Sequence, residues 1–187
     1  MASKDHLKAE DWIKAGFRAL SVGGVQAVRA EALARHLGVS KGSFYWHFKD
    51  VPALKTAMLD HWRDQATGAI IDEIAKAPNP AAQIRLLIDI AASDRDADYG
   101  GRAVEGAIRF WGCCEPEVGL RVAEVDQARL ACLTGLLTAC GVTAEQAENG
   151  AYLLYGALIG LPFIAQPGAL DLRERLLRLL QAVAPSL

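Results

Sequence analysis

Apolar residues recur along almost the whole chain at intervals of three and four positions, which is the spacing of one face of an α-helix. The first such stripe contains Ala9, Ile13, Phe17 and Leu20. Runs of β-branched residues, which favour strands, are few, whereas Ala and Leu occur throughout. The pattern therefore predicts an all-α protein.

Glycine and proline divide this pattern into about nine helices, because both residues interrupt helices. Gly23-Gly24, Gly38 and the run Pro78-Asn79-Pro80 mark three of the boundaries. Ser40 and Asp50 precede two of the helices as residues that can cap a first turn. The predicted helices span about residues 4–21, 30–37, 41–48, 51–77, 81–94, 101–113, 117–140, 143–165 and 169–184.

Two short predicted helices meet at Gly38 in the pattern of a helix-turn-helix unit, whose second helix enters the major groove of DNA. Ala34 and Phe44 belong to the apolar inner face that would hold the two helices together. The outer side of the second helix carries hydrogen-bond donors and flat rings, including Lys41 and Trp46. Because such donors position a protein on phosphates, this stretch predicts a DNA-binding surface.

The run GVSKGSFYWHF, residues 38–48, resembles the DNA-binding signature of the TetR family of bacterial transcriptional repressors, G-V-S-x-[GP]-[ST]-[LF]-Y-x-[HY]-F. The resemblance implies an N-terminal three-helix helix-turn-helix DNA-binding domain over residues 1–50. A larger helical domain for effector binding and dimerisation would occupy residues 51–187. The function implied is a ligand-responsive regulator, expected to be a repressor, that binds a palindromic operator in double-stranded DNA as a homodimer.

The residues expected to contact DNA follow from this resemblance and from local chemistry. Family contacts to the DNA backbone correspond to Lys41, Tyr45 and His47 here, and family contacts to base edges include Gly42 and Trp46. The full expected set is Arg29, Ser40, Lys41, Gly42, Ser43, Tyr45, Trp46, His47 and Lys49.

Three positions depart from the family pattern. Val28-Arg29 stands where many members have a hydroxyl residue as the cap of the second helix, and Arg29 could contact a phosphate instead. Glu31 stands where several members carry a base-reading cation; a carboxylate there could accept only from a cytosine amino group, although a solvated surface role is the alternative. Val51 replaces the usual Lys and removes one expected phosphate contact.

The last two predicted helices have the composition of a dimer interface. Gly156 and Gly160 would let another helix approach, and leucines recur on one stripe of the final helix. The alternative is that these residues pack within the chain's own core. The expected interface residues are Gly156, Gly160, Leu161, Leu172, Leu176, Leu179 and Leu180.

Large or polarisable side chains in the middle of the chain could line a mostly apolar pocket for a small-molecule effector, with a few polar groups to orient it. Each could instead be a core residue. A ligand that fits only one arrangement of the two DNA-reading helices would weaken DNA binding through a population shift. The expected ligand residues are Trp62, Tyr99, Arg102, Glu105, Ile108, Phe110, Trp111, Cys114 and Tyr152.

Charge adds to this picture. The first 50 residues carry eight Lys and Arg against five Asp and Glu, and the rest carry twelve against seventeen. This asymmetry places the expected polyanion contact in the N-terminal quarter.

The longest apolar run, residues 151–165, is too short to cross a bilayer. Nothing at the N-terminus resembles a secretory signal. We therefore expect no membrane partner and a cytoplasmic location.

The remaining chemistry favours a regulator over an enzyme. None of the common phosphate-loop, zinc-protease or serine-hydrolase motifs occurs, and we expect no cofactor and no metal site. Four cysteines, Cys113, Cys114, Cys132 and Cys140, leave open a thiol-based redox or metalloid sensor. A helical adaptor without DNA binding is the other alternative.

Overall fold

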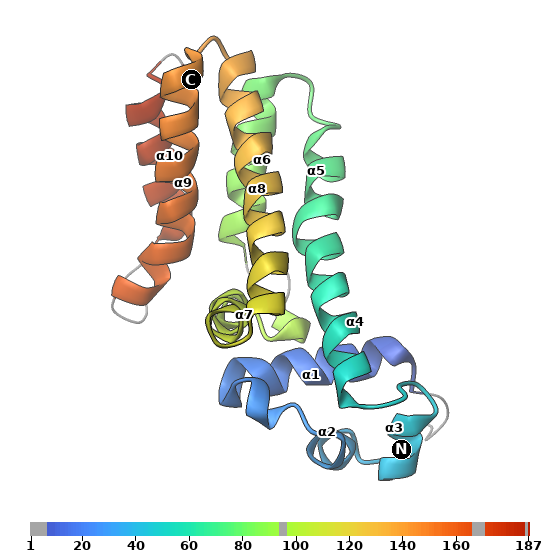
Figure 1. Ribbon diagram of the computed structural model, residues 1–187. Coiled ribbons are helices and arrows are strands. Elements are labelled where there is room, and N and C mark those ends of the chain that lie inside the picture. Colours follow the sequence, from blue (N-terminus) through green and yellow to red (C-terminus); the bar gives the residue numbers. More distant parts are fainter. Residues whose placement is uncertain (1–6, 94–96, 166–170, 186) are drawn as a thin grey trace. The chain divides into compact units, whose positions relative to one another are not determined.

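The computed structural model describes residues 7–93, 97–165, 171–185 and 187, and every regular element in these residues is a helix (Figure 1). The elements are α1 (Ala9–Gly23), η1 (Val25–Ala27), α2 (Ala30–Leu37), α3 (Lys41–Tyr45), α4 (Val51–Arg63), η2 (Asp64–Gly68), α5 (Ala69–Ile74), α6 (Pro80–Ala92), η3 (Ala97–Tyr99), α7 (Ala103–Cys114), α8 (Pro116–Ala139), α9 (Ala144–Ile164) and α10 (Leu172–Val183). Because α4, η2 and α5 follow without interruption, the described chain has nine main helices. The predicted all-α fold class is confirmed.

Local signals explain most helix ends. Gly38 ends α2 with φ of 71°, a left-handed conformation that glycine adopts without steric cost. Asp50 accepts a hydrogen bond from the backbone N–H of Ala53 at 2.8 Å and so caps α4. Ser40 occupies the N-cap position of α3, but its side chain makes no capping bond. The prediction for α3 was wrong at its end, since the helix stops at Tyr45 and not at residue 48.

Two compact units make up the chain. The first comprises Met1–Trp62 and Asp96–Val122, and the second comprises Arg63–Arg95 and Ala123–Leu187. The chain crosses between the units at the end of α4, between α6 and η3, and within α8. The expected division into a DNA-binding domain over 1–50 and an effector domain over 51–187 stays a prediction, since compactness does not test which residues bind DNA.

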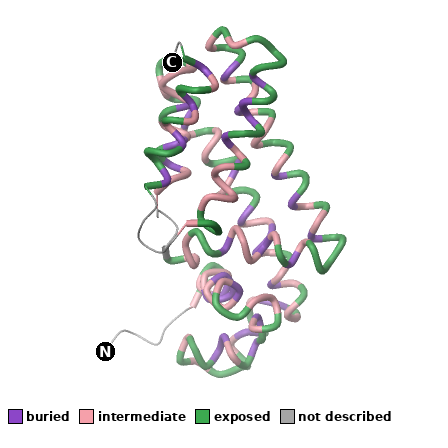
Figure 2. The backbone as a smooth tube through the Cα atoms, turned by 90° about the vertical axis from the view of Figure 1, so that its left-hand side faces the viewer, coloured by how far each residue is buried: buried purple, intermediate pink, exposed green. Residues whose placement is uncertain are grey.

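The core of the first unit fixes α3 against α1. Trp12 and Phe44 are both fully buried, and their rings meet edge to face with centroids 5.3 Å apart. Gly16 of α1 allows close packing, because a Cβ atom there would lie 2.6 Å from the sulfur of buried Met58. Figure 2 shows buried residues recurring between exposed ones along the helices of the chain. The same face of α1 therefore holds both α3 and α4.

The core of the second unit joins α6, α8, α9 and α10 through apolar side chains that include Ile84, Leu137 and Leu154. Figure 1 shows α9 and α10 running side by side. Three residues of the expected dimer interface, Leu172, Leu176 and Leu180, are 2%, 2% and 3% exposed within this core. These three side chains therefore pack within the chain, and their part in a dimer interface stays a prediction.

Candidate nucleic-acid interface

The helix α3 has one buried side and one exposed side. Phe44 is fully buried against Trp12 and Phe48, with the Phe44 and Phe48 ring centroids 5.8 Å apart. Trp46, two positions along, is 89% exposed, and Tyr45 is 52% exposed. An exposed tryptophan is unusual on a protein surface that has no partner, because moving its large apolar ring out of water lowers the free energy.

The nine residues expected to contact DNA all lie in the first unit, from the N-cap of α2 to the turn that follows α3. Seven are exposed, and Ser43 and His47 are half-buried. None is covered within the chain to the extent that Phe44 is. Their contact with DNA stays a prediction.

An ion pair connects α2 with α3 across the turn. The Lys41 ammonium donates to the Glu31 carboxylate, and the ammonium also lies 6.0 Å from the centroid of the Tyr45 ring. The bond to Lys41 lowers the pKa of Glu31, and the bond to Glu31 raises the pKa of Lys41. Both groups are therefore charged, and the pair is intact, throughout the neutral pH range.

A surface hollow of about 210 Å³ lies on α2 beside this pair and is lined by Arg29, Glu31, Ala32 and Arg35. Arg35 was not among the residues expected to bind DNA. The signal was present, however, because Arg29, Ala32 and Arg35 recur at intervals of three and so share one helix face. Two arginines and one glutamate are therefore among the residues that line the hollow.

Four of the residues expected to bind a ligand are partly or fully buried where α4 meets α7 in the first unit. The Trp62 indole donates to Glu105 at 3.2 Å, and Arg109 pairs with the same carboxylate at 2.8 Å. Ile108 and Trp111 are 0% and 2% exposed. Among the described residues, no acceptor reaches the buried indole N–H of Trp111.

The other five expected ligand residues lie elsewhere. Arg102, Phe110 and Cys114 are exposed on the first unit, and Tyr152 is exposed on the second unit. Tyr99 donates to Glu10 at 2.8 Å and stacks on the His61 ring, with centroids 4.7 Å apart. The structure therefore groups Trp62, Glu105, Ile108 and Trp111, and ligand binding by any of the nine stays a prediction.

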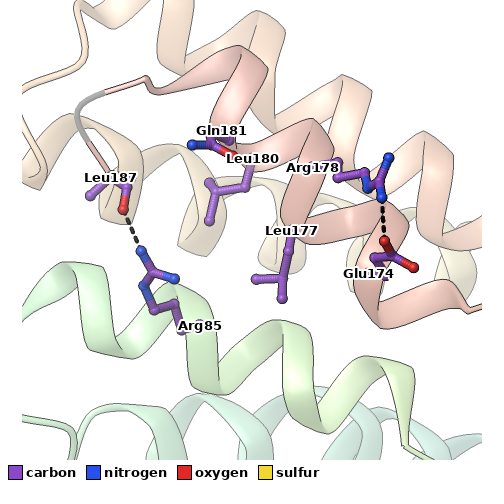
Figure 3. Close-up of a pocket in the computed structure, with 7 residues that line it drawn as sticks. All are labelled: Arg85, Glu174, Leu177, Arg178, Leu180, Gln181 and Leu187. Carbon is purple, nitrogen blue, oxygen red and sulfur yellow. Dashed lines mark hydrogen bonds and ion pairs between the residues drawn. The ribbon is translucent and has the colours of Figure 1, made fainter.

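A second hollow, of about 200 Å³, lies between α6 and α10 of the second unit (Figure 3). Arg85 donates to the Leu187 backbone oxygen on one side of it, and Arg178 pairs with Glu174 on the other. None of the nine expected ligand residues lines either hollow.

Sequence reasoning missed a polar cluster in the second unit. The Arg129 guanidinium donates to the Thr67 hydroxyl at 3.2 Å, to the Ala66 carbonyl at 3.3 Å and to the Tyr155 hydroxyl at 3.0 Å. The Tyr155 hydroxyl in turn donates to Asp126 at 2.7 Å. These groups come from η2, α8 and α9, so no pattern along one helix could have predicted their meeting. The cluster secures η2, whose wider π-type turn contains Ala66 and Thr67.

Comparison with known proteins agrees with the helix-turn-helix geometry. Residues 13–54 match the family model described as bacterial regulatory proteins, tetR family. Over this segment the chain is similar to the TetR family. The matched residues begin in α1 and end in α4, so they contain the whole of α2, the turn at Gly38 and α3. No curated protein matches the chain in sequence.

Solved structures share the TetR fold over nearly the whole chain. A protein from Rhodococcus sp. described as a TetR-family transcriptional regulator is 20% identical, with a TM-score of 0.74 over 94% of this chain and 98% of its own. A transcriptional regulator from Saccharomonospora viridis in complex with choline is 15% identical, with a TM-score of 0.77 over 92% and 95%. FadR from Bacillus subtilis in complex with stearoyl-CoA is 15% identical, with a TM-score of 0.68 over 96% and 100%. At such low identity these likenesses establish the fold.

No described helix combines the length and the apolar character needed to pass through a lipid bilayer. No three His, Cys, Asp or Glu side chains among the described residues come together as metal ligands.

Proposed function

We propose that this protein is a ligand-responsive transcriptional repressor that binds a palindromic DNA operator as a homodimer through α2 and α3. The TetR fold and the match over residues 13–54 support the DNA-binding role. The observation that carries the proposal is the exposed surface of α3 and the turn after it, which contains Lys41, Tyr45, Trp46 and Lys49. Flat rings next to cations suit base edges and phosphates together.

A second copy of the chain is the expected partner of α9. Tyr152, Leu153, Phe163 and Ile164 are 59%, 56%, 70% and 79% exposed on this helix. A Cβ atom at Gly156 or Gly160 would meet nothing within 4 Å in a single copy. Large apolar groups and small residues on one helix favour close packing by another helix. Dimerisation would also align two reading helices with the two halves of a palindrome.

The effector is proposed to be a small, mostly apolar molecule that binds near Trp62, Glu105 and Trp111. The buried Trp111 N–H would give it one hydrogen-bond donor. Two proteins of the same fold were solved with choline and with stearoyl-CoA, which differ in charge and size. The fold therefore accommodates unlike ligands, and the side chains of each member set its specificity.

The test of DNA binding is a mobility shift with duplex DNA that flanks the protein's own gene, at low and at high salt. We expect binding that weakens steeply with salt, since cations that neutralise phosphates release counterions. Trp46→Ala should reduce affinity on the order of tenfold. Leu120→Ala is the matched control, because Leu120 is also an exposed apolar residue, at 68%, in the same unit.

A protein that shifts no duplex at low salt would contradict the repressor proposal and favour the helical adaptor. Repeating the mobility shift with candidate small molecules then tests the effector.

A sensor based on thiols is the second alternative. Cys113 and Cys114 suit this role better than Cys132 and Cys140, because both are exposed. It predicts that oxidation changes the shift without any added effector.

A further inference from the structure

The ion pair between Glu31 and Lys41 lies on the surface proposed to read DNA. Glu31 belongs to the first turn of α2, and Lys41 is the first residue of α3. Their side chains are 58% and 48% exposed. Because exposed ion pairs contribute little to folding stability, the fold alone gives no strong reason for this pairing.

The pair changes what Lys41 can do when DNA arrives. The Glu31 carboxylate offsets the charge of Lys41, so a phosphate that approaches the ammonium also meets the repulsion of a nearby carboxylate. Arg29 and Arg35 line the same hollow as Glu31, and the positive charge of Arg29 also acts on the Glu31 carboxylate. Non-specific affinity grows with each phosphate that is neutralised, so pairing Lys41 with Glu31 lowers it.

Base edges in the major groove satisfy both partners together. Guanine offers two acceptors to a lysine, and the cytosine paired with it offers an amino donor to a carboxylate. Lys41 and Glu31 already lie within hydrogen-bond contact of each other, so a G·C pair could receive both without separating them. An A·T pair presents a different set of groups.

We propose that Glu31 is a specificity-determining residue of the DNA-reading surface: it holds Lys41 away from phosphates and directs the pair to a G·C base pair in each half-site. This inference rests on the proposed DNA-binding function. It predicts that Glu31 weakens binding to arbitrary DNA and sharpens the choice of sequence.

The test uses the full-length protein and a pool of random-sequence duplexes, first unselected and then after rounds of enrichment. Glu31→Gln keeps the size of the side chain and removes its charge. We expect it to bind the unselected pool several-fold more tightly, with a salt slope steeper by about one counterion. After enrichment, the wild-type protein should select a G·C pair at one position of each half-site that Glu31→Gln selects less strongly.

Two further variants separate the pair from other effects. Glu124→Gln removes the same charge from an exposed position on α8, which controls for net charge. In the double variant Glu31→Gln/Lys41→Met, the gain in affinity for the unselected pool should disappear, because Lys41 supplies it. Equal melting temperatures for Glu31→Gln and wild type would confirm that both proteins are folded alike.

The outcomes distinguish this inference from the proposed function. If wild type binds DNA but Glu31→Gln shows the same affinity, salt slope and selected sequences, the inference is overturned and the DNA-binding role stands. Equal gains for Glu31→Gln and Glu124→Gln also overturn it, since net charge would then be the cause. If wild type binds no duplex at low salt, the proposed function fails, and this inference fails with it.

Discussion

The four tryptophans show how the surroundings of a residue decide its role. Trp12, Trp62 and Trp111 are 0%, 6% and 2% exposed, whereas Trp46 is 89% exposed. Residues two positions apart on a helix point in nearly opposite directions, so Phe44 can enter the core while Trp46 faces water. The signature around Trp46 indicated its exposed position from sequence. Nothing local to Trp62 indicated that its indole would meet Glu105, 43 positions away.

The cysteines give a prediction at this scale. Burial raises the pKa of the Cys132 and Cys140 thiols, because a thiolate is less well solvated there. A raised pKa means less thiolate at any given pH below it, and the thiolate is the species that reacts. We expect iodoacetamide at pH 7.5 to label exposed Cys113 and Cys114 first, and Cys132 and Cys140 at least several-fold more slowly.

Mass spectrometry of peptides from timed samples measures the four rates. The rates at Cys132 and Cys140 should rise at higher pH, where their thiols ionise. The urea-unfolded chain is the control, because all four thiols are then solvated and should react alike. Equal rates at Cys113 and Cys132 in the folded protein would contradict the prediction.

At the scale of helices, glycines on α8 and α9 meet very different neighbours. A Cβ atom at Gly150 of α9 would lie 2.2 Å from a methyl carbon of Val183 on α10, so only glycine fits there as the helices stand. A Cβ atom at Gly135 of α8 would meet nothing within 4 Å. Both positions are helical glycines in sequence, and periodicity does not distinguish them.

Gly150→Ala should destabilise the protein by about 1–2 kcal/mol, because the branched Val183 side chain has little freedom to move aside and overpacking outweighs the gain in helix propensity. Gly135→Ala is the matched control and should stabilise it by up to about 1 kcal/mol. Urea unfolding followed by circular dichroism gives both free energies. A neutral Gly150→Ala variant would show that α10 can shift to accommodate the methyl group.

The helices also show how far sequence patterns reach. Helical periodicity and the residues Gly38 and Asp50 predicted most boundaries, since caps act within one turn. The early end of α3 and the π-type turn of η2 were not predicted. The η2 backbone carbonyl of Ala66 and the Thr67 hydroxyl both accept from Arg129 of α8, so contacts between distant segments accompany that turn.

At the scale of the whole molecule, the proposed dimer explains apolar groups that a single copy leaves in water. Leu172, Leu176 and Leu180 are buried within the chain's own core, so they offer little free surface to a partner. The face of α9 with Gly156 and Leu153 offers more, because Gly156 has open space beside it and Leu153 is exposed.

Gly156→Leu tests this surface. A single copy has open space at this position, so the variant should fold, whereas a partner helix that packs there would be pushed away. We expect wild type to sediment as a dimer at micromolar concentration and Gly156→Leu to dissociate at least tenfold more readily, which corresponds to about 1.4 kcal/mol.

Gly135→Leu is the control, since Gly135 is equally open in one copy. Sedimentation velocity over a range of concentrations measures both variants. A wild-type monomer, or equal dimer strength in Gly156→Leu and wild type, would contradict the proposed interface.

The sequence by itself determined the all-α class, the helix-turn-helix unit and the outward direction of α3, because these depend on helical periodicity and on caps within a few residues. Tertiary structure alone decided which leucines of α10 are covered, which glycines are tightly packed and which groups pair with Lys41 and Arg129. Those outcomes depend on side chains that are far apart in the chain and become neighbours only when the helices pack.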